Sequence, residues 1–212
     1  MHAKFEPGKY FHIIARAIDG INLFRNDENK SFFLRRFQHY IRFYADTYAY
    51  CLLDNHVHFL IKPKLVDEIR TYLETIPKEE LTITRRKFLE HPEAFDFNEL
   101  IETQFNYLFV SYVKAFNKVC HRKGGMFIKP FRCIEVRDDF HFTQLIVYIH
   151  ANVIKHRLAR DFTTYYRSSY REIISEGSTF LERDEVLEWF GGKDRFVKVH
   201  HEQAKLYYGD RF

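Results

Sequence analysis

The chain has 212 residues, 46% of them hydrophobic and 18% aromatic, enough to bury the core of one domain with a modest appendage. Its net charge of +4 permits binding to a polyanion but lacks the large excess of a histone-like protein. Three cysteines without CxxC spacing argue against a disulfide framework or a zinc knuckle. No apolar run is long enough to predict a membrane span or a signal peptide, so we expect a cytoplasmic protein, nucleoid-associated if prokaryotic.

Residue periodicity predicts strands and helices that follow one another along the chain. We expect a strand over 10–18, a helix over 26–46, strands over 47–53 and 56–62, helices over 64–76 and 99–121, an extended segment over 126–136, and a helix from Asp138 to about 152–155. Shorter helices are expected at 168–176, at 183–190 and from 193 onward. The short turn at Asp54 and Asn55 makes the second and third strands an antiparallel hairpin.

This order of elements predicts an α+β fold, a ferredoxin-like antiparallel sheet with helices on one face, plus a C-terminal helical extension. We expect the sheet and its helices to occupy residues 1–160, with a peripheral insertion at about 64–98. The helical extension then occupies 161–212.

The strand His56-Val57-His58-Phe59-Leu60-Ile61 carries two kinds of side chain on alternate positions. Because successive strand residues point to opposite faces, Val57, Phe59 and Ile61 pack beneath the helices, and His56 and His58 project together from the other face. Two imidazoles so placed can share one metal ion, although two surface histidines produce the same pattern. A metal site that also admits a substrate needs a third ligand from elsewhere.

The helix that contains QLIVYIHANVIKH places Tyr148 and Asn152 four residues apart, and therefore on one face. Phe142, Leu145 and Ile149 are predicted to hold this helix against the core. A carboxamide oxygen that binds a metal, next to a phenol, suits a metal-assisted attack on a phosphodiester. Taken alone, a tyrosine on an amphipathic helix is usually a core residue.

Together the segments DNHVHFLIKP, VYIHANVIKHRLA and YRSSYRE resemble the HUH single-strand transposases with one catalytic tyrosine, and among them the REP-associated tyrosine transposases. The resemblance covers about residues 8–175 and includes the Phe116-Asn117 pair, the basic turn 122–125 and the stretch 126–132. Two departures are evident. Asp54 stands where the family has proline before the Asn-His pair, and Val153 replaces the proline after Asn152.

The resemblance implies a metal-dependent single-stranded DNA endonuclease and strand transferase. Tyr148 would be the nucleophile that forms a 5′-phosphotyrosine, and His56, His58 and Asn152 would bind Mg²⁺ or Mn²⁺. The expected partner is single-stranded DNA with a hairpin or palindrome, bound by a monomer or by a homodimer that exchanges tyrosine helices. Basic residues that flank these motifs are the candidates for DNA binding: Arg122, Lys123, Lys129, Arg132, Lys155, Arg157 and Arg160.

Two other functions remain open at this point. The same scaffold could bind nucleic-acid hairpins without cutting them, although the presence of His56, His58, Tyr148 and Asn152 argues against that. Alternatively, the histidines could serve a metal-bound water in a hydrolase of small phosphoesters, which would turn over without any protein–DNA adduct.

Overall fold

The structure is a computed structural model that describes residues 3–18 and 20–208, with the backbone alone for 207 and 208. Its centre is a four-stranded sheet in the order β2-β3-β1-β4, in which every neighbouring pair is antiparallel. The strands are β1 (Tyr10–Arg16), β2 (Ala45–Leu52), β3 (His56–Pro63) and β4 (Arg132–Val136). Together with helices between β1 and β2 and between β3 and β4, this order gives the predicted ferredoxin-like arrangement.

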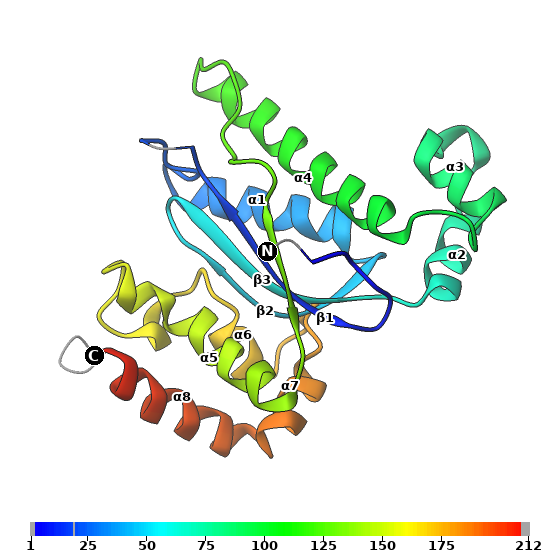
Figure 1. Cartoon of the computed structure of the whole chain (residues 1–212). Coiled ribbons are helices and arrows are strands. Elements are labelled where there is room, and N and C mark those ends of the chain that lie inside the picture. Colours follow the sequence, from blue (N-terminus) through cyan, green and yellow to red (C-terminus); the bar gives the residue numbers. More distant parts are fainter. Residues whose placement is uncertain (1–2, 19, 209–212) are drawn as a thin grey trace.

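Helices cover both faces of the sheet (Figure 1). On one face, α1 (Asp27–Ile41) and α4 (Phe97–Val119) pack against each other, and α1 contacts β2. On the opposite face lies α5 (Asp139–Lys155), which contacts β2 and β3. The predicted fold class is confirmed with one addition, because the face expected to be free of helices is occupied by α5 and the C-terminal helices.

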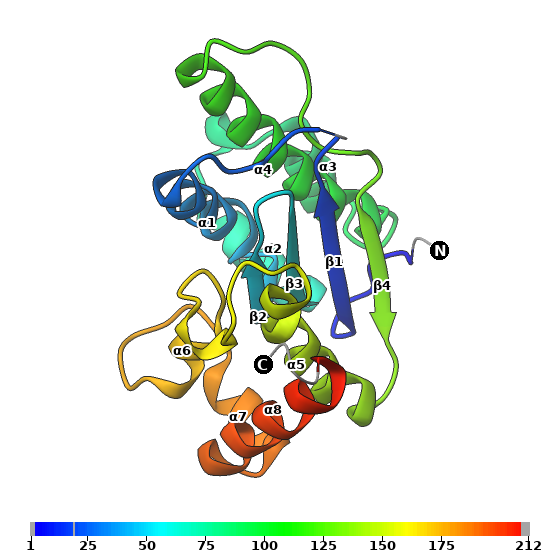
Figure 2. The ribbon, with the colours of Figure 1, turned by 90° about the vertical axis from the view of Figure 1, so that its left-hand side faces the viewer.

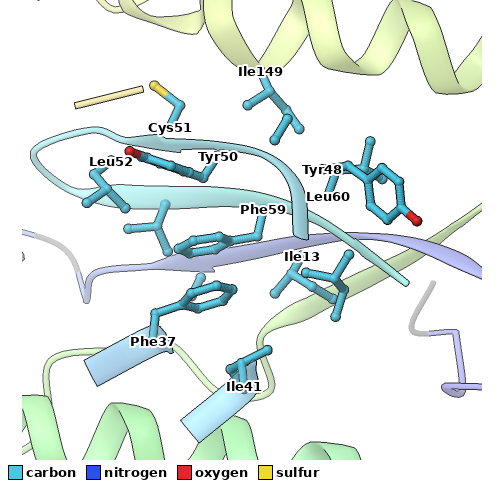
Figure 3. Close-up of a cluster of buried hydrophobic side chains, with 14 of the residues drawn as sticks. Ile13, Phe37, Ile41, Tyr48, Tyr50, Cys51, Leu52, Phe59, Leu60 and Ile149 are labelled. Carbon is cyan, nitrogen blue, oxygen red and sulfur yellow. The ribbon is translucent and has the colours of Figure 1, made fainter. Parts of the chain in front are cut away.

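Apolar side chains fill both interfaces of the sheet. Figure 3 shows Phe37 and Ile41 of α1 on one side of the strands and Ile149 of α5 on the other. The Phe37 ring stacks on Phe59 of β3, with 3.9 Å between ring centroids and 8° between planes. Ile149 is fully buried, and Phe142 and Leu145 are buried with it, so the prediction that these residues hold α5 against the core is confirmed.

Local side-chain hydrogen bonds set the helix starts that the sequence predicts. The side chain of Asn26 accepts a hydrogen bond from the Asn29 amide at the start of α1. Asp138 does the same for the His141 amide at the start of α5. At its other end α5 continues through Val153 to Lys155, because valine keeps the backbone amide that the proline of the family would lack.

The departure at Asp54 has a structural counterpart in the turn between β2 and β3. The Asp54 carboxylate accepts a hydrogen bond from Lys30 Nζ at 2.7 Å. Its carbonyl oxygen accepts from the Leu23 amide, also at 2.7 Å. Asp54 therefore ties the hairpin to the segment that leads into α1, and the turn forms without proline.

The segment predicted to be a peripheral insertion folds into α2 (Val66–Glu74), a short 3₁₀ turn (Lys78–Glu80) and α3 (Ile83–Glu90), at the end of the sheet away from the β2–β3 turn (Figure 1). All three cysteines are free thiols; Cys51 and Cys133 are buried and Cys120 is half-buried. Among the described residues, none of the helices combines the length and the apolar character needed to cross a bilayer.

The C-terminal helices attach to α5 (Figure 2). They are α6 (Tyr170–Ile174), α7 (Arg183–Phe190) and α8 (Lys193–Tyr208), preceded by a 3₁₀ turn (Phe162–Thr164). A buried polar chain joins them: Ser169 Oγ lies 2.7 Å from His150 Nε2, and His150 Nδ1 lies 2.8 Å from His200 Nε2. His200 Nδ1 donates to the Phe196 carbonyl at 2.8 Å. This chain links α5 to α6 and α8.

The buried histidine of α8 makes stability depend on pH. Burial lowers the pKa of His200 to about 3, whereas an unfolded histidine titrates near 6.5. Between these two values the unfolded chain binds the extra proton, so stability present at pH 7 is lost as the pH falls. From pH 7 to pH 5 this group lowers the free energy of unfolding by about 2 kcal/mol.

Urea unfolding at both pH values should show that His200→Leu removes about this much of the pH dependence, whereas exposed His91→Gln keeps it all. An equal pH dependence in His200→Leu and wild type would contradict the assignment.

Candidate active site

Strand pairing places the two predicted histidines at the start of β3, on the sheet face that α5 covers. In β3, Val57, Phe59 and Ile61 alternate with His56, His58 and Leu60, as predicted. His56 is 3% exposed and His58 is 1% exposed, because α5 lies over them. Because both histidines are buried, the hydrogen bonds that their ring nitrogens make determine which nitrogens remain available to bind a ligand.

Each ring of this pair has one nitrogen engaged. His56 Nδ1 lies 2.7 Å from Asn55 Oδ1, an oxygen that can only accept, so Nδ1 carries the proton. His58 Nδ1 lies 2.8 Å from Nε2 of His12 on β1. Burial lowers the pKa of His56 to about 4 and that of His58 well below its usual value. Both imidazoles are therefore neutral at pH 7, which is the form that binds metals.

One side of α5 faces these histidines. The Tyr148 ring stands edge-on to the His58 ring, with centroids 5.8 Å apart. Two turns later the His156 ring contacts the His56 ring at 4.6 Å. Asn152 lies midway between them on the same side of the helix and is fully buried. Its Nδ2 donates to the Tyr148 carbonyl at 3.0 Å, so its Oδ1 points away from that carbonyl.

Three buried side-chain atoms at this place have no hydrogen-bond partner. They are His56 Nε2, His58 Nε2 and Asn152 Oδ1, half of the six buried side-chain nitrogen and oxygen atoms left unpaired in the part of the chain described. An unpaired buried polar group costs about 1–3 kcal/mol, so native proteins rarely leave several together without a use. Within 3–18 and 20–208, no group of three or more His, Cys, Asp or Glu side chains is placed to hold a metal. The set described above contains only two such residues, His56 and His58, because its third member is an asparagine.

No known family model and no curated protein matches this sequence. One solved structure is similar. It is described as a REP-associated tyrosine transposase bound to a REP hairpin, and it shares 12% sequence identity with this chain. The superposition covers 85% of this chain and 87% of that one, with a TM-score of 0.48.

The predicted DNA-binding residues lie in different environments. Lys155 Nζ stands over the Tyr148 ring, 5.5 Å from its centroid, and Arg132 is exposed on β4. Four others are exposed in the loops after α4 and α5: Lys123, Lys129, Arg157 and Arg160. Both loops lie at the end of the sheet where β1 ends and β3 begins (Figure 1). Arg122 differs, because its guanidinium donates to the Asn117 side chain and to the carbonyls of Gly124 and Gly125, and so holds the turn together.

Sequence reasoning missed three residues that border the site. Arg16 is exposed at the end of β1 and is opposite His56 on the neighbouring strand. Burial is the main cause of the lowered pKa values of His56 and His58, and the positive charge of Arg16 lowers them further. His156 could have been found from its spacing, four residues after Asn152. The contact of His12 with His58 could not be predicted from the sequence, because it depends on the register between β1 and β3.

Proposed function

We propose that this chain is a metal-dependent single-stranded DNA endonuclease and strand transferase, a transposase, in which Tyr148 forms a 5′-phosphotyrosine intermediate. The observation that carries the proposal is the set of three unpaired buried atoms, on His56, His58 and Asn152, beside the Tyr148 ring. The sequence supports it, because these four residues are those that the family motifs name.

The donor set fits Mg²⁺ or Mn²⁺. A carboxamide oxygen is a ligand type that both ions accept, and neutral imidazole is the commonest metal ligand among protein side chains. For His56 and Asn152, the hydrogen bond made by the other polar atom of the side chain leaves the acceptor atom free to bind. Ligands oriented before the ion arrives lose little freedom on binding it, as oriented imidazoles in known metal sites do.

The chemistry follows from the residues at hand. When bound, the ion would polarise the scissile phosphate and stabilise the charge that grows in the transition state. The Tyr148 oxygen forms a bond to phosphorus, the bond from phosphorus to the 3′ oxygen breaks, and that oxygen takes up a proton. The phenolic proton leaves to solvent, since Tyr148 is only half-buried. The phosphotyrosine keeps the energy of the phosphodiester, so attack by another 3′-hydroxyl can rejoin DNA without ATP.

Cations beside the site suit a polyanionic substrate. Arg16, Arg132 and Lys155 come from β1, β4 and α5, and all three are exposed. Arginine and lysine side chains bind phosphate oxygens and position a strand without reading its sequence. We infer that single-stranded DNA flanking a hairpin or palindrome crosses this end of the sheet.

The decisive experiment detects a protein–DNA adduct. Wild-type protein is incubated with Mn²⁺ and a library of hairpins flanked by random single strands, labelled at either the 3′ or the 5′ end, and analysed on a denaturing gel. The 3′ label should migrate with the protein, and the 5′ label should appear on shortened DNA, with both products lost in EDTA. Hairpin binding without an adduct would refute the nuclease, and turnover of small phosphoesters without an adduct would favour the hydrolase.

A further inference from the structure

We propose that His12 is a positioning residue that selects the metal-binding tautomer of His58. The inference rests on the proposed function, since it assumes that His58 Nε2 binds the ion. Both rings are almost completely buried, 6% exposed for His12 and 1% for His58. They lie nearly parallel, with centroids 5.1 Å apart and planes at 22°, and their facing nitrogens are 2.8 Å apart.

The sheet fixes this pair in place. His12 is opposite Leu60 and Ile14 is opposite His58, so His12 and His58 are diagonal neighbours on one face of antiparallel strands. Diagonal neighbours are within reach of long or aromatic side chains, and here the two imidazoles meet. The Tyr148 ring stands edge-on to both, at 6.2 Å from His12 and 5.8 Å from His58. His12 therefore borders the place where the nucleophile packs.

Two proton arrangements satisfy the bond between the histidines. In the first, His58 Nδ1 donates to His12 Nε2, which leaves a lone pair on His58 Nε2. In the second, His12 Nε2 donates to His58 Nδ1, and the proton of neutral His58 then sits on Nε2, where it blocks a metal ion. Only the first arrangement can bind. Metal binding thus requires His12 to act as acceptor, with its own proton on Nδ1.

His56 differs from His58 in this respect. Its partner Asn55 offers an oxygen that can only accept, so the tautomer of His56 is fixed before any ion arrives. An imidazole partner can accept or donate, so the tautomer of His58 depends on that of His12. Outer-shell partners of this kind typically change metal affinity by about 10–100-fold when they are removed.

Two variants of His12 and one matched control test this role. His12→Leu removes the acceptor, and we expect the affinity for Mn²⁺, measured by titration calorimetry, to fall about 10–100-fold. His12→Gln supplies a carboxamide acceptor and should restore most of that affinity. Ile14→Leu changes a neighbour on the same strand and face without removing a hydrogen bond, and it should bind Mn²⁺ as wild type does. Thermal melting of the metal-free proteins reports any loss of folding separately.

Nitrogen NMR of histidine-labelled wild type gives a readout that needs no variant. With Mg²⁺ bound, His58 should carry its proton on Nδ1, and His12 should show a lone pair on Nε2. A proton on His12 Nε2 in the loaded protein, or unchanged Mn²⁺ affinity in His12→Leu, would overturn the inference. A wild type that binds no Mn²⁺ overturns this inference and the proposed metal site together. One that binds Mn²⁺ and forms no DNA adduct overturns the nuclease alone, and the affinities still decide the role of His12.

Discussion

Replacing Tyr148 with phenylalanine is expected to abolish the covalent DNA–protein product, with a fall on the order of 10³-fold or more, as for other enzymes that lose their nucleophile. The substitution removes one oxygen and keeps the ring that packs edge-on to His12 and His58. Folding, Mn²⁺ affinity and hairpin binding should therefore stay close to wild type. The measurement is the 3′-labelled adduct on a denaturing gel, with peptide mass spectrometry to locate the modified residue.

Tyr107→Phe is the matched control for that experiment. Tyr107 is a half-buried tyrosine on α4, on the other side of the sheet, and its loss should leave adduct formation unchanged. An adduct that persists in Tyr148→Phe, or a modified peptide that does not contain residue 148, would show that another residue is the nucleophile. Equal loss of adduct in both variants would indicate an effect on folding instead.

The second large effect is expected at Asn152. Asn152→Leu keeps a side chain of similar size at this position but removes the unpaired Oδ1, the only oxygen among the three proposed ligands. We expect Mn²⁺ affinity to fall by at least about 100-fold, more than the 10–100-fold typical of outer-shell partners. Stability without metal should stay within about 1 kcal/mol, because the side chain loses one hydrogen bond and one unpaired buried acceptor.

This combination separates a metal ligand from a structural residue. In wild type, Mn²⁺ at 100 times its dissociation constant stabilises the fold by about 2.7 kcal/mol, which raises the melting temperature. Asn152→Leu should melt at nearly the same temperature with and without Mn²⁺. The exposed control Asn106→Leu should keep the full Mn²⁺-dependent rise. If Asn152→Leu kept that rise as well, Asn152 would not be a ligand.

Much of the fold could be predicted because its signals are local. Alternation in β3 assigned His56 and His58 to one face, and Asp138 marked the start of α5, whereas the sequence left Asn26 and Asp27 as alternative caps of α1 and the structure shows Asn26. The extended segment was predicted too long, since β4 begins only at Arg132 and residues 126–128 make no more than isolated contacts with the end of β1. These are backbone pairings between segments far apart in the chain, and no local pattern encodes them.

The site was predicted only in part for the same reason. Tyr148 and Asn152 share a helix face, which spacing alone reveals. The pairing of His12 with His58 and the place of Arg16 depend on strand register, a property of two segments about 45 residues apart. The hydrogen bonds of the Arg122 guanidinium to carbonyls of its own turn could not be predicted either, because sequence does not show which groups a guanidinium contacts.

The chain of Ser169, His150 and His200 has a consequence for any assembly of this protein. In this chain α5 lies on its own sheet, so Tyr148 meets histidines of the same molecule. Ten residues of α5 are buried, some against the strands and some against the C-terminal helices. If two copies exchanged their tyrosine helices, moving α5 alone would break the hydrogen bonds of His150 to Ser169 and to His200. The exchanged segment would therefore have to include α5 together with the C-terminal helices, with the hinge at Arg137 and Asp138 between β4 and α5.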